Sequence, residues 1–362
     1  MRFTFMCKKD MVPIAGPHGR GKIAIVGAGP AGLAASGYLV CQGYEVDVYD
    51  KLPLPGGLMS FAIPSFRISI NSIIEGVEDL RDNFSVKFIL NTKVFKRDTV
   101  RRDEGDEFTK NTVDLRELLN NYDAILIATG TWKSRKMNIP GEDSKGVYTA
   151  LEYLFLLKSY ELGYLNHEPP KANKVIVVGG GLSAIDAAEV MIHRGADEVY
   201  LVYRRTINEA PAGSFEINRL RRLGVKWMEL AAPKRIIADA TGNVKEVELI
   251  KMKLGEPDES GRPRPIPIEG SEFTIEADMV IEAVGEIATS PFPDQEYLGI
   301  KQDRRGRIIV NDELRTGNEK VFAAGDVVSG PSKVGRAIFL GLNAARNIHL
   351  YLTTKRISKG GT

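Results

Sequence analysis

The stretch KIAIVGAGPAGLAASGYLVCQGYEVDVYDK, Lys22–Lys51, decides the fold. It begins with a short apolar run, turns through closely spaced glycines, continues as a run of helix-forming apolar residues and ends in an alternating apolar segment. This order predicts a strand, a tight turn, a helix and a second strand, which together form a βαβ unit. The sheet built on such a unit is parallel and buried.

The turn of this unit matches the pattern G-x-G-x-x-G and predicts a dinucleotide site. The first glycine makes the turn, the second admits a pyrophosphate close to the backbone, and the third lets the helix pack on the strand. The backbone amides and the helix dipole then attract the phosphates. A turn that serves packing alone is the alternative. The residues expected to bind are Gly27, Ala28, Gly29, Pro30, Ala31 and Gly32.

Asp50 ends the second strand, where its carboxylate can accept hydrogen bonds from the ribose hydroxyls of an adenosine without a 2′-phosphate. This favours FAD or NAD at the first turn. A surface carboxylate at a strand end is the other interpretation.

The same unit recurs as KVIVVGGG, LSAIDAAEVMIHRG and DEVYLVYRR. Its turn is the variant that ends in alanine, and the binding residues expected from it are Gly179, Gly180, Gly181, Leu182 and Ser183. Arg204 and Arg205 stand where the first unit has its acid. A guanidinium offers a fork of donors to a phosphate, so the pair predicts the 2′-phosphate of NADP. Arginine also stacks on adenine, so NAD remains possible, and a solvated basic strand end is the simplest alternative.

Two copies of one unit, followed by a tail that belongs to neither, indicate an insertion. We expect an α/β fold of two Rossmann-like domains, with the NAD(P) domain inserted into the FAD domain. The expected ranges are 1–21 for an N-terminal extension, 22–147 and 286–362 for the FAD-binding domain, and 148–285 for the NAD(P)-binding domain.

The composition excludes several classes of protein. The 362 residues carry a formal net charge of only +2, which argues against nucleic acid as the main partner. The two cysteines form no C-x-x-C pair, and an iron–sulfur cluster needs about four thiolates. The uncharged run 23–44 is broken by glycines and is expected to be a strand and a buried helix rather than a membrane span. No secretory signal is visible, so a cytoplasmic location is expected.

The segments GAGPAG, PLPGGL, IPSFR, GGGLSAIDAA, VYRR and AAGD, in this order, resemble the small (beta) subunit of glutamate synthase. They are also similar to the FAD/NADP part of dihydropyrimidine dehydrogenase and to the NADP-binding subunit of a ferredoxin-dependent transhydrogenase. The similarity runs from about Lys22 to Leu352. Those relatives carry a cysteine-rich N-terminal iron–sulfur region, or sit in a chain that does, whereas residues 1–21 here hold one cysteine.

The resemblance implies FAD in the first domain and NADP in the second. Besides the first turn and Asp50, the residues expected at the cofactors are Lys51, Gly57, Leu58, Arg67, Val94, Ala128, Thr129, Gly130, Gly285, Gly325, Asp326, Lys333 and Val334. Within this set, Val94 is expected to contact adenine through its backbone and Asp326 to bind the ribityl chain. A helix that starts near Val334 would aim its positive end at the flavin.

The chemistry expected is hydride transfer between nicotinamide and FAD, which needs no catalytic side chain and no protein-bound metal. Because the chain has no disulfide pair or cluster of its own to receive electrons, we expect them to pass to an iron–sulfur subunit or ferredoxin in a hetero-oligomeric oxidoreductase. One alternative is a free-standing NADPH-dependent flavin reductase, or diaphorase, that acts on a small acceptor. The other is a non-catalytic nucleotide-binding subunit.

Overall fold

The computed structural model describes residues 19–96, 103–258, 261–292 and 294–360, so the expected extension lies outside it except for its last residues. The chain divides into two compact units. The first unit comprises the residues up to Lys133 and those from Glu286 onward, and the second is Ser134–Gly285. The second unit thus includes residues 134–147, which lie before the expected NAD(P)-binding range of 148–285. The reason is that strand β8 (Val147–Thr149) and the loop before it pack with the second unit.

The first unit is built on a five-stranded sheet in the order β20-β6-β1-β2-β3. All of its neighbouring strands run parallel. The strands are β1 (Lys22–Val26), β2 (Glu45–Tyr49), β3 (Lys87–Ile89), β6 (Ala124–Ile127) and β20 (Val321–Ala323). Strands β1 and β2 are joined through helix α1 (Pro30–Cys41), so the predicted βαβ unit is present.

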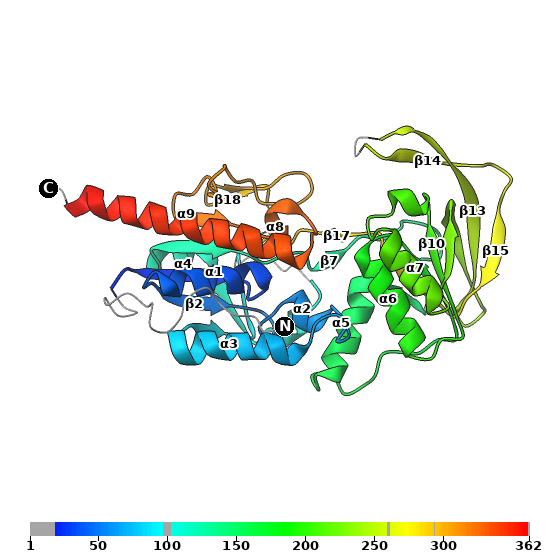
Figure 1. The fold of residues 1–362 in the computed structure, drawn as a ribbon, viewed down its shortest axis with the longest axis horizontal. Coiled ribbons are helices and arrows are strands. Elements are labelled where there is room, and N and C mark those ends of the chain that lie inside the picture. The colour runs from blue at the N-terminus through cyan, green and yellow to red at the C-terminus, as the bar shows by residue number, and fades with distance from the viewer. Residues whose placement is uncertain (1–18, 97–102, 259–260, 293, 361–362) are drawn as a thin grey trace. The chain divides into compact units, whose positions relative to one another are not determined.

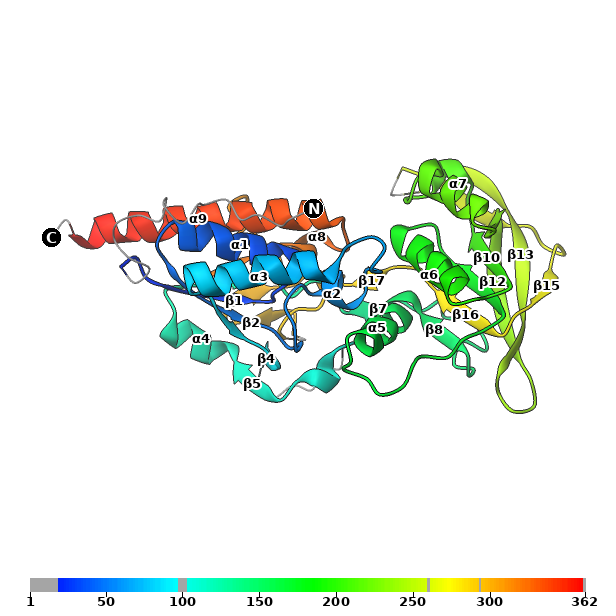
Figure 2. The ribbon, with the colours of Figure 1, turned by 60° about the horizontal axis from the view of Figure 1, so that its bottom comes forward.

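Alternate residues of these strands enter two separate cores. Ile23 and Ile25 face a core shared with α1, α3 (Ile70–Phe84) and α9 (Val334–Gly360). Ala24 and Val26 face the opposite core, which includes residues of β4 (Thr92–Phe95) and α4 (Leu115–Asn121). Figure 2 shows α1, α3 and α9 together on one side of β1 and β2, with α4 and β4 on the other. The period of two along each strand explains why both faces are apolar.

The second unit holds a parallel sheet in the order β11-β10-β9-β16-β8. Its strands besides β8 are β9 (Lys174–Val178), β10 (Glu198–Tyr203), β11 (Lys226–Glu229) and β16 (Met279–Glu282). An antiparallel sheet packs on one face and buries Val178, Val202 and Val280. It consists of β12 (Ala231–Ala238), β13 (Val244–Pro257), β14 (Pro263–Pro267) and β15 (Phe273–Glu276).

Helices belong to the other face of this parallel sheet. Figure 1 shows them on the side away from β13 and β15. They are α5 (Ala150–Glu161), α6 (Leu182–His193) and α7 (Ser214–Arg222). The N-terminus of α5 is held by a capping box between Thr149 and Glu152.

The remaining elements are short. They are α2 (Leu58–Phe61), α8 (Asp326–Ser329), η2 (Asp106–Phe108), η3 (Ile207–Glu209), β5 (Asn111–Asp114), β7 (Lys133–Ser134), β17 (Glu286–Ile287), β18 (Glu296–Tyr297) and β19 (Ile300–Lys301). Within the described ranges no helix has the length and apolar character needed to cross a membrane. The same residues contain no group of three or more acidic, histidine or cysteine side chains placed to hold a metal ion.

Candidate dinucleotide sites

The first glycine turn lies at the carboxyl end of β1, where parallel strands bind ligands. Gly27 has φ +111° and donates its N–H to the Tyr49 carbonyl at 2.8 Å. A Cβ on Gly27 would lie 2.3 Å from the Ala128 oxygen, and one on Gly32 would lie 1.9 Å from the Gly27 oxygen. Both positions therefore require glycine for packing within the protein itself.

Gly29 differs from these two glycines. Its φ is −75°, and a Cβ there would meet no atom within 4 Å. It caps the N-terminus of α1, so free amides of the first helical turn point toward the open space beside it. Gly57 has φ +56° and packs directly against the backbone of Gly29, because a Cβ on Gly57 would lie 3.0 Å from the Gly29 Cα. The open space beside Gly29, at the N-terminus of α1, is thus the candidate cradle for the pyrophosphate of a dinucleotide.

The carboxylate of Asp50 stabilises the same turn. One oxygen accepts the Ala28 N–H at 2.6 Å and the other accepts the Leu52 N–H at 2.9 Å. The side chain is buried, and this burial raises the pKa of Asp50. Asp50 is therefore a structural part of the turn as well as the candidate partner of a ribose.

The other residues expected at FAD come from loops around this turn. Gly56 donates to the Ala28 carbonyl at 2.8 Å, which brings Gly57 and Leu58, the first residue of α2, beside the first unit's turn. Arg67 follows a turn closed on Pro64 and is half-buried. Val94 is buried within β4.

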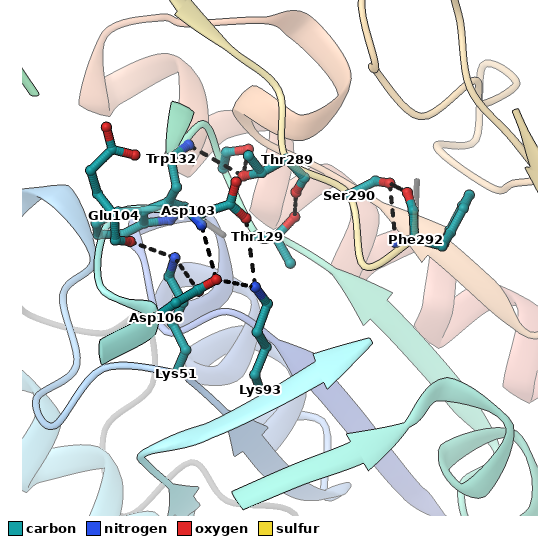
Figure 3. Close-up of polar contacts among 11 residues, drawn as sticks. Lys51, Lys93, Asp103, Glu104, Asp106, Thr129, Trp132, Thr289, Ser290 and Phe292 are labelled. Carbon is teal, nitrogen blue, oxygen red and sulfur yellow. Dashed lines mark hydrogen bonds and ion pairs between the residues drawn. The ribbon is translucent and has the colours of Figure 1, made fainter. Parts of the chain in front are cut away.

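The segment Ala128–Gly130 lies against the glycine turn from the neighbouring strand. Ala128 donates to the Val26 carbonyl, and Thr129 donates its hydroxyl hydrogen to the Thr289 carbonyl at 2.5 Å. Gly130 in turn accepts the Thr289 N–H. Figure 3 shows Thr129 and Thr289 side by side.

Gly325 and Asp326 follow β20, which neighbours β6 in the sheet. Gly325 has φ +77° and caps α8, whose first residue is Asp326. Asp326 accepts a hydrogen bond from the Ser332 hydroxyl at 2.5 Å, and burial raises the pKa of this carboxyl. Helix α9 then begins at Val334, directly after Lys333, as the sequence predicts.

Lys51 makes contacts that the sequence does not reveal. Its ammonium donates to the Glu104 carbonyl at 2.5 Å and to Asp106 at 3.1 Å, and it lies 4.7 Å from the centre of the Trp132 ring. Lys93 pairs with the other oxygen of Asp106, and Figure 3 shows the two lysines converging on it. Burial lowers the pKa of Lys51. This side chain is committed to holding the turn around Asp106, and no sequence motif marks that turn.

The second glycine turn repeats the first in the other unit. Gly179 has φ +150° and donates to the Val202 carbonyl at 2.9 Å, while a Cβ there would lie 2.3 Å from the Ala283 oxygen. Gly180 lies against the Tyr203 ring, because a Cβ on Gly180 would come 2.6 Å from the nearest ring carbon. Gly181 caps α6 and, like Gly29, has open space around it. Leu182 and Ser183 form the first turn of α6, and Gly285, with φ +114°, ends the unit.

The two arginines after β10 have different surroundings. Arg204 is exposed, and its guanidinium has no hydrogen bond or ion pair to any residue that the structure describes. Arg205 is 2% exposed and is bonded to Asp258 and to the Pro263 carbonyl. The expectation that both arginines hold one phosphate therefore fits Arg204, whereas Arg205 is already engaged. Asp258 lies in the polar stretch EPDESGRPRPIP, and no motif in that stretch indicates that it pairs with Arg205.

Comparison with known proteins identifies the family. The model of the family described as "Pyridine nucleotide-disulphide oxidoreductase" matches residues 21–341. The chain belongs to this family. Members bind FAD and a pyridine nucleotide, so the chain is an oxidoreductase that uses FAD and NADP. Its chain order, with two dinucleotide turns and the second unit inserted, accords with that assignment.

Curated relatives confirm the resemblance to glutamate synthase small chains. The chain is 34% identical to the "Glutamate synthase [NADPH] small chain" of Escherichia coli over 343 residues, which are 91% of this chain and 68% of that protein. It is 37% identical to the "NADP(+)-dependent formate dehydrogenase subunit beta" of Moorella thermoacetica over 91% of this chain and 44% of that one. The chain thus spans about half the length, or less, of some curated relatives that it matches.

Solved structures show the same fold. FprA from Mycobacterium tuberculosis, as its His57Gln mutant, has a TM-score of 0.78 at 20% identity, and the match covers 94% of this chain and 86% of that one. The thioredoxin reductase of T. acidophilum has a TM-score of 0.63 at 22% identity, and the match covers 93% of this chain and 99% of that one. The expected α/β flavoprotein fold is confirmed.

Asp50 offers a direct test of the first site. In the Asp50→Ala variant the buried Ala28 N–H loses its acceptor, which costs about 1–3 kcal/mol of folding free energy. A ribose partner would be lost as well, so we expect the FAD dissociation constant to rise by roughly tenfold or more. Fluorescence titration of the deflavinated protein measures the second effect and thermal unfolding the first. An Asp50→Ala protein that binds FAD as tightly as the parent would contradict the assignment.

Proposed function

We propose that this flavoprotein is the electron-entry module of a larger cytoplasmic oxidoreductase. It takes a hydride from NADPH, or returns one to NADP, and exchanges electrons with an iron–sulfur subunit or ferredoxin. The observation that carries the proposal is the pair of glycine cradles, one followed by Asp50 and the other by Arg204, in a chain with two cysteines.

The charged side chains beside the two turns have opposite signs, as binding of FAD at one turn and NADP at the other would require. Asp50 directly follows β2 beside the first turn, where a 2′-phosphate would meet a carboxylate and be repelled. Arg204 directly follows β10 beside the second turn, and its guanidinium makes no hydrogen bond or ion pair with the described part of the chain. The first turn is thus suited to the adenosine of FAD and the second to that of NADP.

The residues of this protein would bind and orient the cofactors. Bound FAD would supply the redox chemistry by accepting a hydride. The open space beside Gly29 would admit the pyrophosphate, and the amides of the first turn of α1 face it. Asp326 lies at the carboxyl edge of the same sheet, where a polyhydroxyl chain of the cofactor would find an acceptor. No step calls for a side-chain acid or base.

The proposal of an outside electron acceptor rests on the relatives and on composition. Several relatives are named as subunits, including the "NADPH-Fe(3+) oxidoreductase subunit beta" of Geobacter sulfurreducens, which is 34% identical over 93% of this chain and 50% of that protein. An iron–sulfur cluster needs about four thiolates, more than the two cysteines present. Cys41 is disulfide-bonded, which contradicts the expectation that the chain has no disulfide pair. The proposal that electrons leave FAD through another protein therefore rests on the subunit names of the relatives and on the lack of enough thiolates for a cluster.

The test is anaerobic spectroscopy followed by capture of the partner. We expect the purified chain to be yellow, to bleach with NADPH and to reduce an artificial dye. Affinity capture from the native cells under anaerobic conditions should recover a protein that contains iron and acid-labile sulfide. Re-oxidation of the bleached flavin by that partner, faster than by dye alone, completes the test. A chain that stays colourless with added FAD, or one that turns over a quinone rapidly without any partner, would contradict the proposal.

A further inference from the structure

We infer that Arg205 is a positioning residue for the nucleotide site and that Arg204 alone of the pair binds the 2′-phosphate. This inference rests on the proposed NADP site and goes beyond it, because it assigns a structural task to the hairpin formed by β13 and β14. The described residues at the junction of these strands, Asp258 and Gly261–Pro263, are called the hairpin turn below.

Arg205 joins the hairpin turn to the strand end that carries Arg204. Its Nη2 donates to the Asp258 carboxylate at 2.5 Å and its Nε donates to the Pro263 carbonyl at 2.7 Å. These acceptors lie on either side of the turn, so one planar guanidinium bonds both arms of the hairpin. Two backbone hydrogen bonds join the ends of this turn. The Asp258 N–H donates to the Arg262 carbonyl, and the Gly261 N–H donates to the Asp258 carbonyl.

The backbone reinforces this junction. The Arg205 carbonyl accepts the Leu230 N–H at 3.1 Å, and the Leu230 carbonyl accepts the Met252 N–H at 2.7 Å. Met252 belongs to β13, so the end of β10 is tied to the hairpin through main chain as well as side chain. A hairpin alone is marginally stable, and its far turn needs such an anchor to keep one position.

Burial and charge both argue against Arg205 as a phosphate ligand. Its side chain is 2% exposed, and its charge is balanced by a carboxylate that is 31% exposed. To reach a phosphate it would have to leave both bonds and abandon Asp258, and breaking one half of a buried pair costs several kcal/mol. Arg204 needs no such rearrangement, since its guanidinium is exposed and unengaged within the described residues.

Arg204 also lies beside the second glycine turn, where the ribose of a bound nucleotide is expected. Val202 pairs with Val178, the residue before the glycine turn, and Gly179 donates to the Val202 carbonyl. The Tyr203 ring packs under Gly180. Arg204 is the next residue, so the anchor at Arg205 holds the strand end at the edge of the turn where a bound adenosine ribose would lie.

Four variants separate positioning from direct binding: Arg204→Ala, Arg204→Lys, Arg205→Lys and Asp258→Asn. Dissociation constants for NADPH and NADH are measured by titrating each purified flavoprotein. Arg204→Ala should raise the NADPH constant about 10- to 100-fold and leave the NADH constant within about twofold, because one charge-assisted phosphate contact is lost. Arg204→Lys should recover most of this loss, since a point charge still binds a phosphate.

Arg205→Lys keeps the charge but loses the planar fork whose Nε and Nη2 donate to the Pro263 carbonyl and to Asp258. We expect it to weaken NADPH binding several-fold, unlike the matched Arg204→Lys. Asp258→Asn is the decisive variant. If Arg205 bound the phosphate, removing its carboxylate would tighten NADPH binding. If it positions the hairpin turn, the loss of the anchor should weaken binding and speed amide hydrogen exchange at Asp258 and Gly261 by roughly tenfold or more.

Arg235→Lys is the matched control, because Arg235 also bonds a β13 carboxylate, that of Glu248, but its side chain is 56% exposed. It should change neither nucleotide affinity nor exchange at the hairpin turn. Tighter NADPH binding by Asp258→Asn, or equal behaviour of the two lysine variants, would overturn the inference and leave the NADP site standing. Equal losses of NADPH and NADH in Arg204→Ala would instead refute the NADP site itself.

Discussion

The Gly29→Ala variant is expected to fold as well as the parent protein and to lose FAD. The added Cβ meets no protein atom within 4 Å, and the φ of −75° suits alanine, so the fold accepts it. The same methyl group enters the open space beside Gly29, where the pyrophosphate is expected to lie. Overpacking of this kind costs about 1–3 kcal/mol, which corresponds to a rise of roughly 5- to 150-fold in the FAD dissociation constant. Thermal unfolding of the apoprotein and FAD titration measure the two effects.

Two other glycines provide the matched controls. Gly181→Ala makes the same change at the N-cap of α6 and should keep FAD while weakening NADPH binding. Gly32→Ala places its Cβ 1.9 Å from the Gly27 oxygen, so α1 could not pack on β1, and we expect a loss of folding free energy of about 3 kcal/mol or more. If Gly29→Ala retained full FAD affinity, or Gly181→Ala released the flavin, the two cradles would be wrongly assigned.

The Glu282→Gln variant is expected to be more stable than the parent at pH 8 and equally stable at pH 5. Glu282 ends β16 and is 2% exposed, and neither of its oxygens has a partner with full hydrogen-bond geometry among the described residues, although the Met137 N–H lies close enough to oppose the rise of its pKa. Burial raises the pKa of Glu282 to about 7, with Glu142 adding to the rise and Lys136 opposing it.

The direction in which stability changes with pH follows from the raised pKa of Glu282. The folded protein binds a proton near pH 7 that the unfolded chain binds only near pH 4.5, so folding is favoured at low pH. That stability is fully present below about pH 4.5 and is lost as the pH rises through about 7. The whole change amounts to about 3 kcal/mol. Glutamine carries no charge and should flatten this dependence, although its buried amide keeps part of the desolvation cost.

The fluorescence of Trp227 can report the unfolding of the second unit, which contains Glu282. Trp227 lies in β11, and Trp132 is the other tryptophan of the chain. In a Trp132→Phe background, urea unfolding followed by tryptophan fluorescence reports the second unit at pH values of about 5, 6, 7 and 8. Glu276→Gln, which changes an exposed carboxylate on strand β15 of the same unit, is the control and should keep the parental slope. Parental stability that is flat between about pH 6 and 8 would contradict the expectation.

Local features of the chain were predicted well because they depend on residues close together in sequence. The glycine turns, the strands on either side of them and the start of α9 follow from period-two and helical patterns and from the positive φ that glycine permits. The order of the two units followed from the repeat itself. The start of the insertion did not, because residues 134–147 carry no motif and join the second unit only by packing.

The sequence by itself determined that this protein has two glycine turns between strand and helix, one unit followed by an acid and the other by two arginines. Only the tertiary structure decided which arginine is available, since the partner of Arg205 lies 53 residues away on a hairpin turn. It likewise buried Glu282 without a partner of full hydrogen-bond geometry among the described residues and committed Lys51 to Asp106. The physical reason is that backbone conformation is set by near neighbours, whereas the pairing and desolvation of a charge depend on whichever distant segments pack against it.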